Sequence, residues 1–81
     1  MNANEARLKQ VLADLFELPV EAVGDRTSPD TVPKWDSAAH LNLVLALENA
    51  FDISFTEQQS VEILNYPLIK AVLGEHGVKF Q

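Results

Sequence analysis

The sequence predicts an all-α fold: a four-helix bundle of three longer helices and one short helix, with a long loop between the first two helices. Three observations favour this class: apolar residues recur at helical spacing, no segment alternates as a strand does, and prolines and N-cap residues punctuate the chain. The 81 residues suffice for one domain, residues 1–81, and 47% of them are hydrophobic. No cysteine is present, so packing must hold the fold without disulfides.

The first helix is expected over residues 4–17, where apolar residues form one stripe: Leu8, Val11, Leu12, Leu15 and Phe16. Pro19 should end it, because proline disfavours the helical conformation of the residue before it. Residues 18–36 have no sustained period and contain turn-forming residues. We expect an ordered crossover there, with a short helical turn near Glu21, that lets the flanking helices lie nearly parallel.

The second helix is predicted over residues 37–51, with Asp36 or Ser37 as its N-cap. It carries two apolar stripes. The first suits the core and comprises His40, Leu43, Val44, Leu47 and Phe51. The second begins beside Ser37 and comprises Ala38, Leu41, Leu45 and Glu48. A small bundle cannot easily bury a helix on all sides, so the second stripe is expected to be a binding surface.

Two further helices complete the prediction. Thr56 is a suitable N-cap for a short helix from Glu57 to about Glu62. Pro67 suits the first turn of a last helix that runs to about His76. Gly77 can then supply a left-handed C-cap.

The charge pattern is acidic, with a net charge of −6. No Lys or Arg lies between Lys34 and Lys70, a segment that contains Asp36, Glu48, Asp52, Glu57 and Glu62. This balance disfavours nucleic acid and membrane surfaces as partners. It fits either a solvated face or a docking face for proteins with basic patches, and charge alone does not choose between them. The polar N-terminus lacks a signal-peptide pattern, so a cytoplasmic protein is expected, and we expect a monomer.

The segment from Trp35 to Phe51 resembles the modification-site helix of acyl carrier proteins. It has Asp36-Ser37 at the start of the helix and Leu47-Glu48-Asn49-Ala50-Phe51 at its end. The resemblance extends over the whole chain in helix lengths and loop placement. It implies that a phosphopantetheinyl transferase attaches 4'-phosphopantetheine, taken from coenzyme A, to the Ser37 hydroxyl. Acyl groups would then be carried as thioesters on the thiol of that arm.

The resemblance also implies the remaining roles. The chain would be a non-catalytic carrier and a covalent substrate of acyl-loading and acyl-processing enzymes in fatty-acid, polyketide or related biosynthesis. Asp36 would be the motif neighbour of Ser37. The expected docking residues are Ala38, Leu41, Leu45, Glu48, Glu57 and Glu62, and the candidates for an acyl pocket are Val44, Leu47 and Ile63. No metal site is expected, because His40 and His76 lack ligand spacing.

The chain departs from the usual pattern around the serine. Ala38 stands where the family usually has Leu, and Lys34-Trp35 replaces the usual Leu-Gly, which favours a specialised carrier. Two alternatives remain open: a peptidyl carrier protein, and an unmodified helical interaction module. Without the resemblance, Ser37 would be an ordinary N-cap, His40 a partly exposed helix residue and Trp35 an anchor for the loop.

Overall fold

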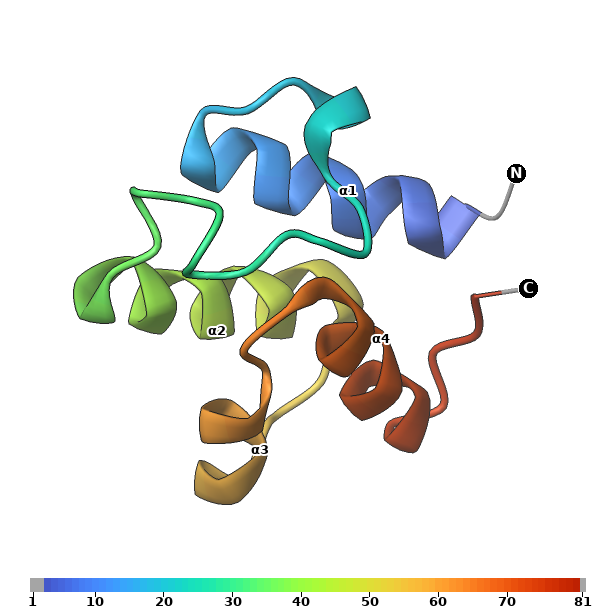
Figure 1. The fold of residues 1–81 in the computed structure, drawn as a ribbon. Coiled ribbons are helices and arrows are strands. Elements are labelled where there is room, and N and C mark those ends of the chain that lie inside the picture. The colour runs from blue at the N-terminus through green and yellow to red at the C-terminus, as the bar shows by residue number, and fades with distance from the viewer. Residues whose placement is uncertain (1–2, 81) are drawn as a thin grey trace.

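The computed structural model describes residues 3–80 and contains α-helices, one 3₁₀ turn and no strand in that part of the chain. The all-α class is therefore confirmed. The elements are, in order, α1 (Ala3–Phe16), η1 (Val20–Ala22), α2 (Ser37–Phe51), α3 (Glu57–Glu62) and α4 (Tyr66–Glu75) (Figure 1). The expected turn near Glu21 is present as η1.

Helices α1 and α2 run antiparallel (Figure 1). The Arg7 guanidinium, near the start of α1, donates a hydrogen bond to the Ala50 carbonyl near the end of α2, at 3.2 Å. At the opposite end, the rings of Phe16 and Trp35 stack with their centroids 5.0 Å apart. The expectation of nearly parallel helices was wrong, because the linker runs back along α1 as far as η1 and then returns.

Helices α2 and α3 begin at side-chain caps that the sequence indicates. Asp36 caps α2 by accepting the Ala39 backbone N–H at 2.8 Å. Thr56 and Gln59 form a reciprocal capping box at the start of α3. These caps satisfy backbone donors that have no partner within the helix, so they fix where each helix starts.

Three helices end at a residue in the left-handed conformation: Glu17 (φ 55°), Asp52 (φ 53°) and Gly77 (φ 87°). In each case the next residue's N–H reaches back five positions to a helix carbonyl, in the bonds Leu18–Ala13, Ile53–Glu48 and Val78–Leu73. This is the Schellman arrangement, and it confirms the predicted role of Gly77. The same arrangement at Glu17 ends α1 at Phe16, one residue before the expected end.

One hydrophobic core unites the elements. Its fully buried members include Leu8, Leu12, Phe16, Leu43, Leu47, Ile63, Tyr66, Ile69 and Leu73. Trp35 is 5% exposed, so it anchors the linker to the core as expected. The linker is further tied to α4 by a hydrogen bond from the Tyr66 N–H to the carbonyl of buried Thr27, at 3.0 Å.

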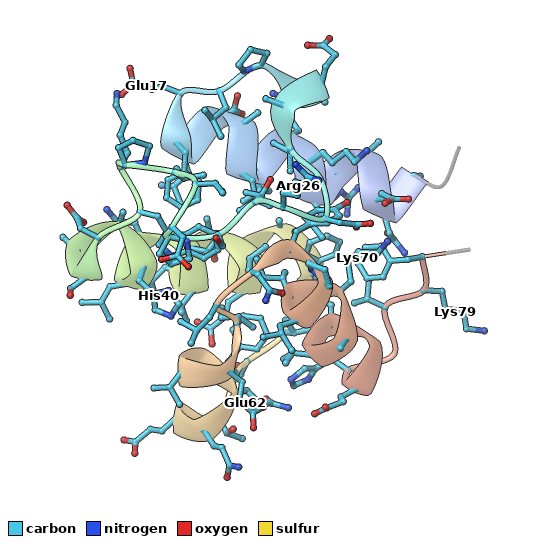
Figure 2. The ribbon with its side chains drawn as sticks, viewed as in Figure 1. Glu17, Arg26, His40, Glu62, Lys70 and Lys79 are labelled. Atoms are coloured by element: carbon cyan, nitrogen blue, oxygen red, sulfur yellow. The ribbon has the colours of Figure 1, made fainter. Side chains whose placement is uncertain are left out.

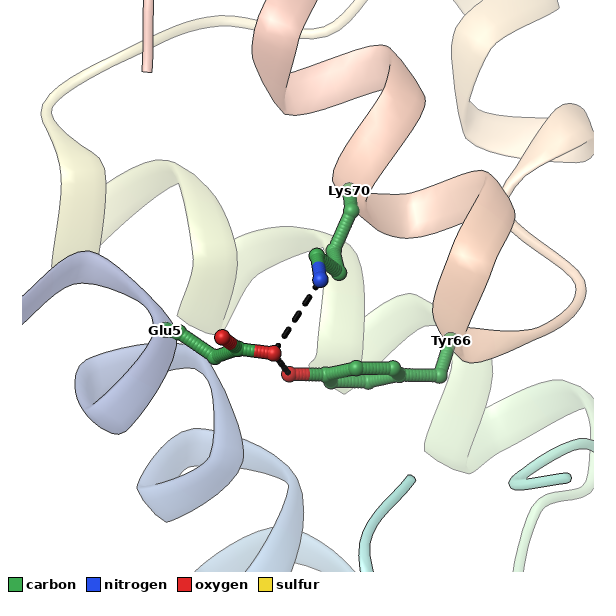
Figure 3. Close-up of polar contacts among 3 residues, drawn as sticks. All are labelled: Glu5, Tyr66 and Lys70. Atoms are coloured by element: carbon green, nitrogen blue, oxygen red, sulfur yellow. Dashed lines mark hydrogen bonds and ion pairs between the residues drawn. The ribbon is translucent and has the colours of Figure 1, made fainter. Parts of the chain in front are cut away.

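The edge of the core between α1 and α4 carries a polar cluster (Figure 3). Glu5 Oε2 accepts hydrogen bonds from the Tyr66 hydroxyl and the Lys70 ammonium, both at 3.1 Å. These two bonds, that from Lys70 foremost, lower the pKa of Glu5 below its ordinary value. Burial, together with the Glu5 carboxylate, raises the pKa of Tyr66 well above its usual range. The cluster therefore favours an ionised Glu5 and a neutral Tyr66.

Candidate functional site

Ser37 is the first residue of α2, and its side chain is exposed. The capping bond at this helix start is made by Asp36, so of the two expected caps the structure selects Asp36. The Ser37 hydroxyl makes no hydrogen bond with any side chain or backbone group of residues 3–80. The serine is thus accessible, and no hydrogen bond to residues 3–80 holds its hydroxyl.

An apolar groove of about 570 Å³ lies beside Ser37. One wall comes from the linker and the start of α2, and the other from α3 and the residues after it. Its lining consists of Pro29, Trp35, Asp36, Ser37, His40, Leu41, Val61 and Leu64. The groove therefore gives a group attached to Ser37 an apolar surface within immediate reach.

Three of the four residues of the second stripe of α2 are exposed, as predicted, whereas Glu48 is half-buried. Leu41 is 67% and Leu45 58% exposed, and Ala38 is exposed as well. Val61 and Leu64, for which no role was predicted, extend this surface with exposures of 66% and 50%. Their signal was weak, because α3 is too short to show an apolar period.

The acidic docking candidates differ in their surroundings. Glu57 and Glu62 are exposed on α3. Glu48 is half-buried, and its carboxylate accepts the Phe55 backbone N–H at 2.8 Å. Glu48 therefore holds the link between α2 and α3, a role that the sequence did not reveal.

The three candidates for an acyl pocket lie away from the groove. Leu47 and Ile63 are fully buried in the core, and Val44 is half-buried beside it. None of the three lines the groove beside Ser37. A pocket at these residues would require the core to open, so that part of the site stays a prediction.

His40 is a residue of α2, and its side chain contacts α3 at Ser60 (Figure 2). Its Nδ1 accepts a hydrogen bond from Trp35 Nε1–H at 3.1 Å, and its Nε2 lies 2.6 Å from the Ser60 carbonyl oxygen. His40 was expected to lie in the core-facing stripe of α2 and to be partly exposed, and it is half-buried, but the sequence indicated neither of these contacts. They connect the linker, α2 and α3 around the groove.

Within residues 3–80, no group of three His, Cys, Asp or Glu side chains is placed to hold a metal ion. In the same part of the chain, no helix has both the length and the apolar character that crossing a membrane requires. No protein-family model matches the sequence, and no curated protein matches it significantly.

Proposed function

We propose that this chain is an acyl carrier protein, which holds acyl groups as thioesters on a 4'-phosphopantetheine arm attached to Ser37. The observation that carries the proposal is the setting of Ser37: an exposed hydroxyl without a hydrogen bond in residues 3–80, at a helix N-terminus, beside an apolar groove. A group attached to this oxygen would break no hydrogen bond that the Ser37 hydroxyl makes within residues 3–80.

The start of α2 suits a phosphodiester. The unpaired N–H groups and the positive end of the helix dipole favour an anion there. The Ser37 oxygen would form the new bond to phosphorus, and the nucleotide part of coenzyme A would leave. The arm, once bound, supplies the thiol that a chain without cysteine lacks.

The groove supports the carrier proposal at the acyl group. Trp35, Leu41, Val61 and Leu64 offer apolar surface on both sides of it. An acyl chain lying there would be partly shielded from water while staying accessible to an enzyme. We propose this groove, in preference to a pocket at Leu47, as the resting place of the cargo.

The proposed partners are a phosphopantetheinyl transferase and acyl-processing enzymes with basic docking patches. Exposed Leu41 and Leu45, together with Glu57 and Glu62 on α3, would form the docking surface. We further propose the four-helix bundle of carrier proteins as the architecture, with the linker of residues 17–36 between α1 and α2. Ala38 and the Lys34-Trp35 pair favour a specialised pathway over fatty-acid synthesis.

The test is the intact mass of the chain after incubation with coenzyme A, Mg²⁺ and a broad-specificity phosphopantetheinyl transferase. We expect one arm on the wild type, none on Ser37→Ala and one on Ser54→Ala. Ser54 is a matched control, because it is an exposed serine in the link between α2 and α3. An arm on Ser37→Ala would contradict the assignment of the site.

A second candidate function is an unmodified helical interaction module. The exposed leucines of α2, together with Val61 and Leu64, favour it, because exposed apolar residues that gather on one face often mark a protein contact. The same mass measurement decides between the two. No addition with several transferases would favour the module, and the exposed apolar face would then be its principal site.

A further inference from the structure

Both ring nitrogens of His40 are engaged, and their partners fix its tautomer. The indole N–H of Trp35 can only donate, so Nδ1 of His40, 3.1 Å away, must accept. The Ser60 carbonyl can only accept, so Nε2 must carry the proton. His40 in this structure is therefore neutral, with its hydrogen on Nε2.

This arrangement ties together the two walls of the groove beside Ser37. Trp35 belongs to the linker wall, Ser60 belongs to α3, and His40 bridges them from α2. The planes of the two rings are inclined by 19°, and their centroids lie 6.2 Å apart. The distance of 3.1 Å between Trp35 Nε1 and His40 Nδ1 lies within the range of N–H hydrogen bonds.

Protonation of His40 would break one of its two bonds and keep the other. A proton on Nδ1 would face the indole N–H, and two donors cannot bond to each other. The bond from Nε2–H to the Ser60 carbonyl would remain. Because Trp35 is 5% exposed, its N–H could find water only if the indole moved away from its present position.

We propose that His40 is a positioning residue: its neutral form holds Trp35 in the wall of the groove, and its protonation releases Trp35 and weakens the groove's hold on an apolar guest. The effect on a bound acyl chain rests on the proposed function. We call the hydrogen bond between Trp35 and neutral His40 the latch. It is a property of the unmodified chain and does not depend on the arm.

His40 makes its two hydrogen bonds and its ring contact with uncharged groups, and the charged residues near it in the sequence and on α3 make other contacts or are exposed. From the linker, Lys34 pairs with Glu17, and Asp36 caps α2. On α3, Glu57 and Glu62 are exposed. On α2 itself, Glu48 is bonded to the Phe55 N–H.

Between pH 5 and pH 8, histidine is the side chain whose charge ordinarily changes. The chain has two histidines, and the other one, His76, contacts Gln59 Oε1 at 2.9 Å, away from the groove lining. His76→Gln is therefore the matched control for a change at His40.

The experiment uses the unmodified chain at about pH 7.5 and about pH 5.5, which bracket ordinary histidine titration. Trp35 is the only tryptophan, so acrylamide quenching of its fluorescence measures exposure of the indole. We expect quenching to increase at the lower pH. The Kd for the neutral apolar dye N-phenyl-1-naphthylamine should rise about fivefold, the factor that corresponds to one hydrogen bond of roughly 1 kcal/mol.

Two variants isolate the latch, with circular dichroism as the check that each is folded. In His40→Gln, the amide can accept from Trp35 and donate to the Ser60 carbonyl but cannot titrate, so both pH responses should vanish. Trp35→Phe keeps a ring and removes the N–H, so the dye affinity should lose its pH dependence. His76→Gln should respond as the wild type does.

A pH response that persists in His40→Gln or in Trp35→Phe would overturn the proposal, as would a wild type without one. Loss of the pH response in His76→Gln would mean that the response comes from His76 and not from His40. Absence of dye binding at the higher pH would show that the groove does not bind an apolar guest, which would also overturn the proposal. None of these readouts involves the arm, so a failure of Ser37 loading leaves them unaffected.

Discussion

The Tyr66 hydroxyl donates a hydrogen bond to Glu5 Oε2 at 3.1 Å, although the two residues are 61 positions apart in the chain. The bond joins the start of α1 to the start of α4 (Figure 3). The Lys70 ammonium donates to the same oxygen and lies 5.4 Å from the Tyr66 ring centroid. The first and last helices thus meet through one carboxylate.

This carboxylate predicts a loss of stability in acid. The pKa of Glu5 is lowered from 4.5 by its bonds to Lys70 and Tyr66. The contribution of the Glu5 carboxylate to the free energy of unfolding is therefore full above the ordinary carboxyl pKa. It is lost as the pH falls through the lowered pKa. Glu5→Gln should lower the melting temperature at about pH 7, and the difference from wild type should shrink toward about pH 3.

The control for the acid prediction is Glu21→Gln, which changes an exposed carboxyl on η1. It should leave the pH dependence of the melting temperature close to that of the wild type. A pH-independent difference between Glu5→Gln and wild type would show that the ionised carboxylate is not what stabilises the fold.

The phenol of the same cluster predicts a loss of stability in alkali. The pKa of Tyr66 is raised, chiefly by burial and then by Glu5. The contribution of the neutral hydroxyl to the free energy of unfolding is therefore full below about pH 10, and it is lost as the pH rises through the raised pKa. Tyr66→Phe should cost about 1 kcal/mol at neutral pH. Denaturant titrations at rising pH should show a smaller alkaline loss in the variant, and equal losses would contradict the argument.

The left-handed residue at the end of α2 predicts that two substitutions differ in stability. Asp52 has a φ of 53°, which glycine adopts without the steric cost of a Cβ. Asp52→Gly should therefore be more stable than Asp52→Ala by about 1 kcal/mol in urea unfolding. Both variants remove the same charge, so the comparison isolates the backbone. An alanine variant as stable as the glycine one would disprove strain at this position.

The two stripes of α2 predict opposite responses to the same truncation. Leu47 is fully buried, so Leu47→Ala should cost about 2–5 kcal/mol through the cavity that it leaves. Leu45 is 58% exposed, so Leu45→Ala should stay within about 0.5 kcal/mol of wild type. Thermal unfolding measures both, and the reverse order would mean that the helix is rotated from the orientation described.

The two neighbouring polar residues at the start of α2 should differ in how much they stabilise the fold. Asp36 makes the capping bond, so Asp36→Ala should cost about 1 kcal/mol of stability. Ser37→Ala should cost less than about 0.5 kcal/mol, because the serine is not the cap. Urea unfolding of the two variants measures the difference. A larger loss in Ser37→Ala would return the capping role to the serine and weaken the case for a free hydroxyl.

Local signals in the sequence were sufficient for the helices. Thr56 followed by Gln59, Pro67 in a first turn and Gly77 after the last helix are short-range patterns whose physics involves only neighbouring residues. The boundaries of α2 and α3 agree with those expected. The separation of exposed Leu45 from buried Leu47 also followed from helical periodicity alone.

Contacts between distant segments could not be predicted in the same way. The path of the linker decides that Trp35 meets His40 and that α1 and α2 are antiparallel, and the linker has no periodic pattern. Glu48 looked like a surface acid, because the sequence does not show that the Phe55 N–H comes within 2.8 Å of it. The groove was missed for the same reason, since its walls come from separate segments of the chain.

None of the six residues of α3 is buried. The helix is held by its caps, by Ile63, by the bond from His40 to the Ser60 carbonyl, and by the bonds of Gln59 to Glu75 and His76. Such a helix can detach while the contacts among the longer helices persist, so its opening costs a fraction of the free energy of global unfolding. We therefore expect the wall of the groove on α3 to open more readily than the wall built on Trp35.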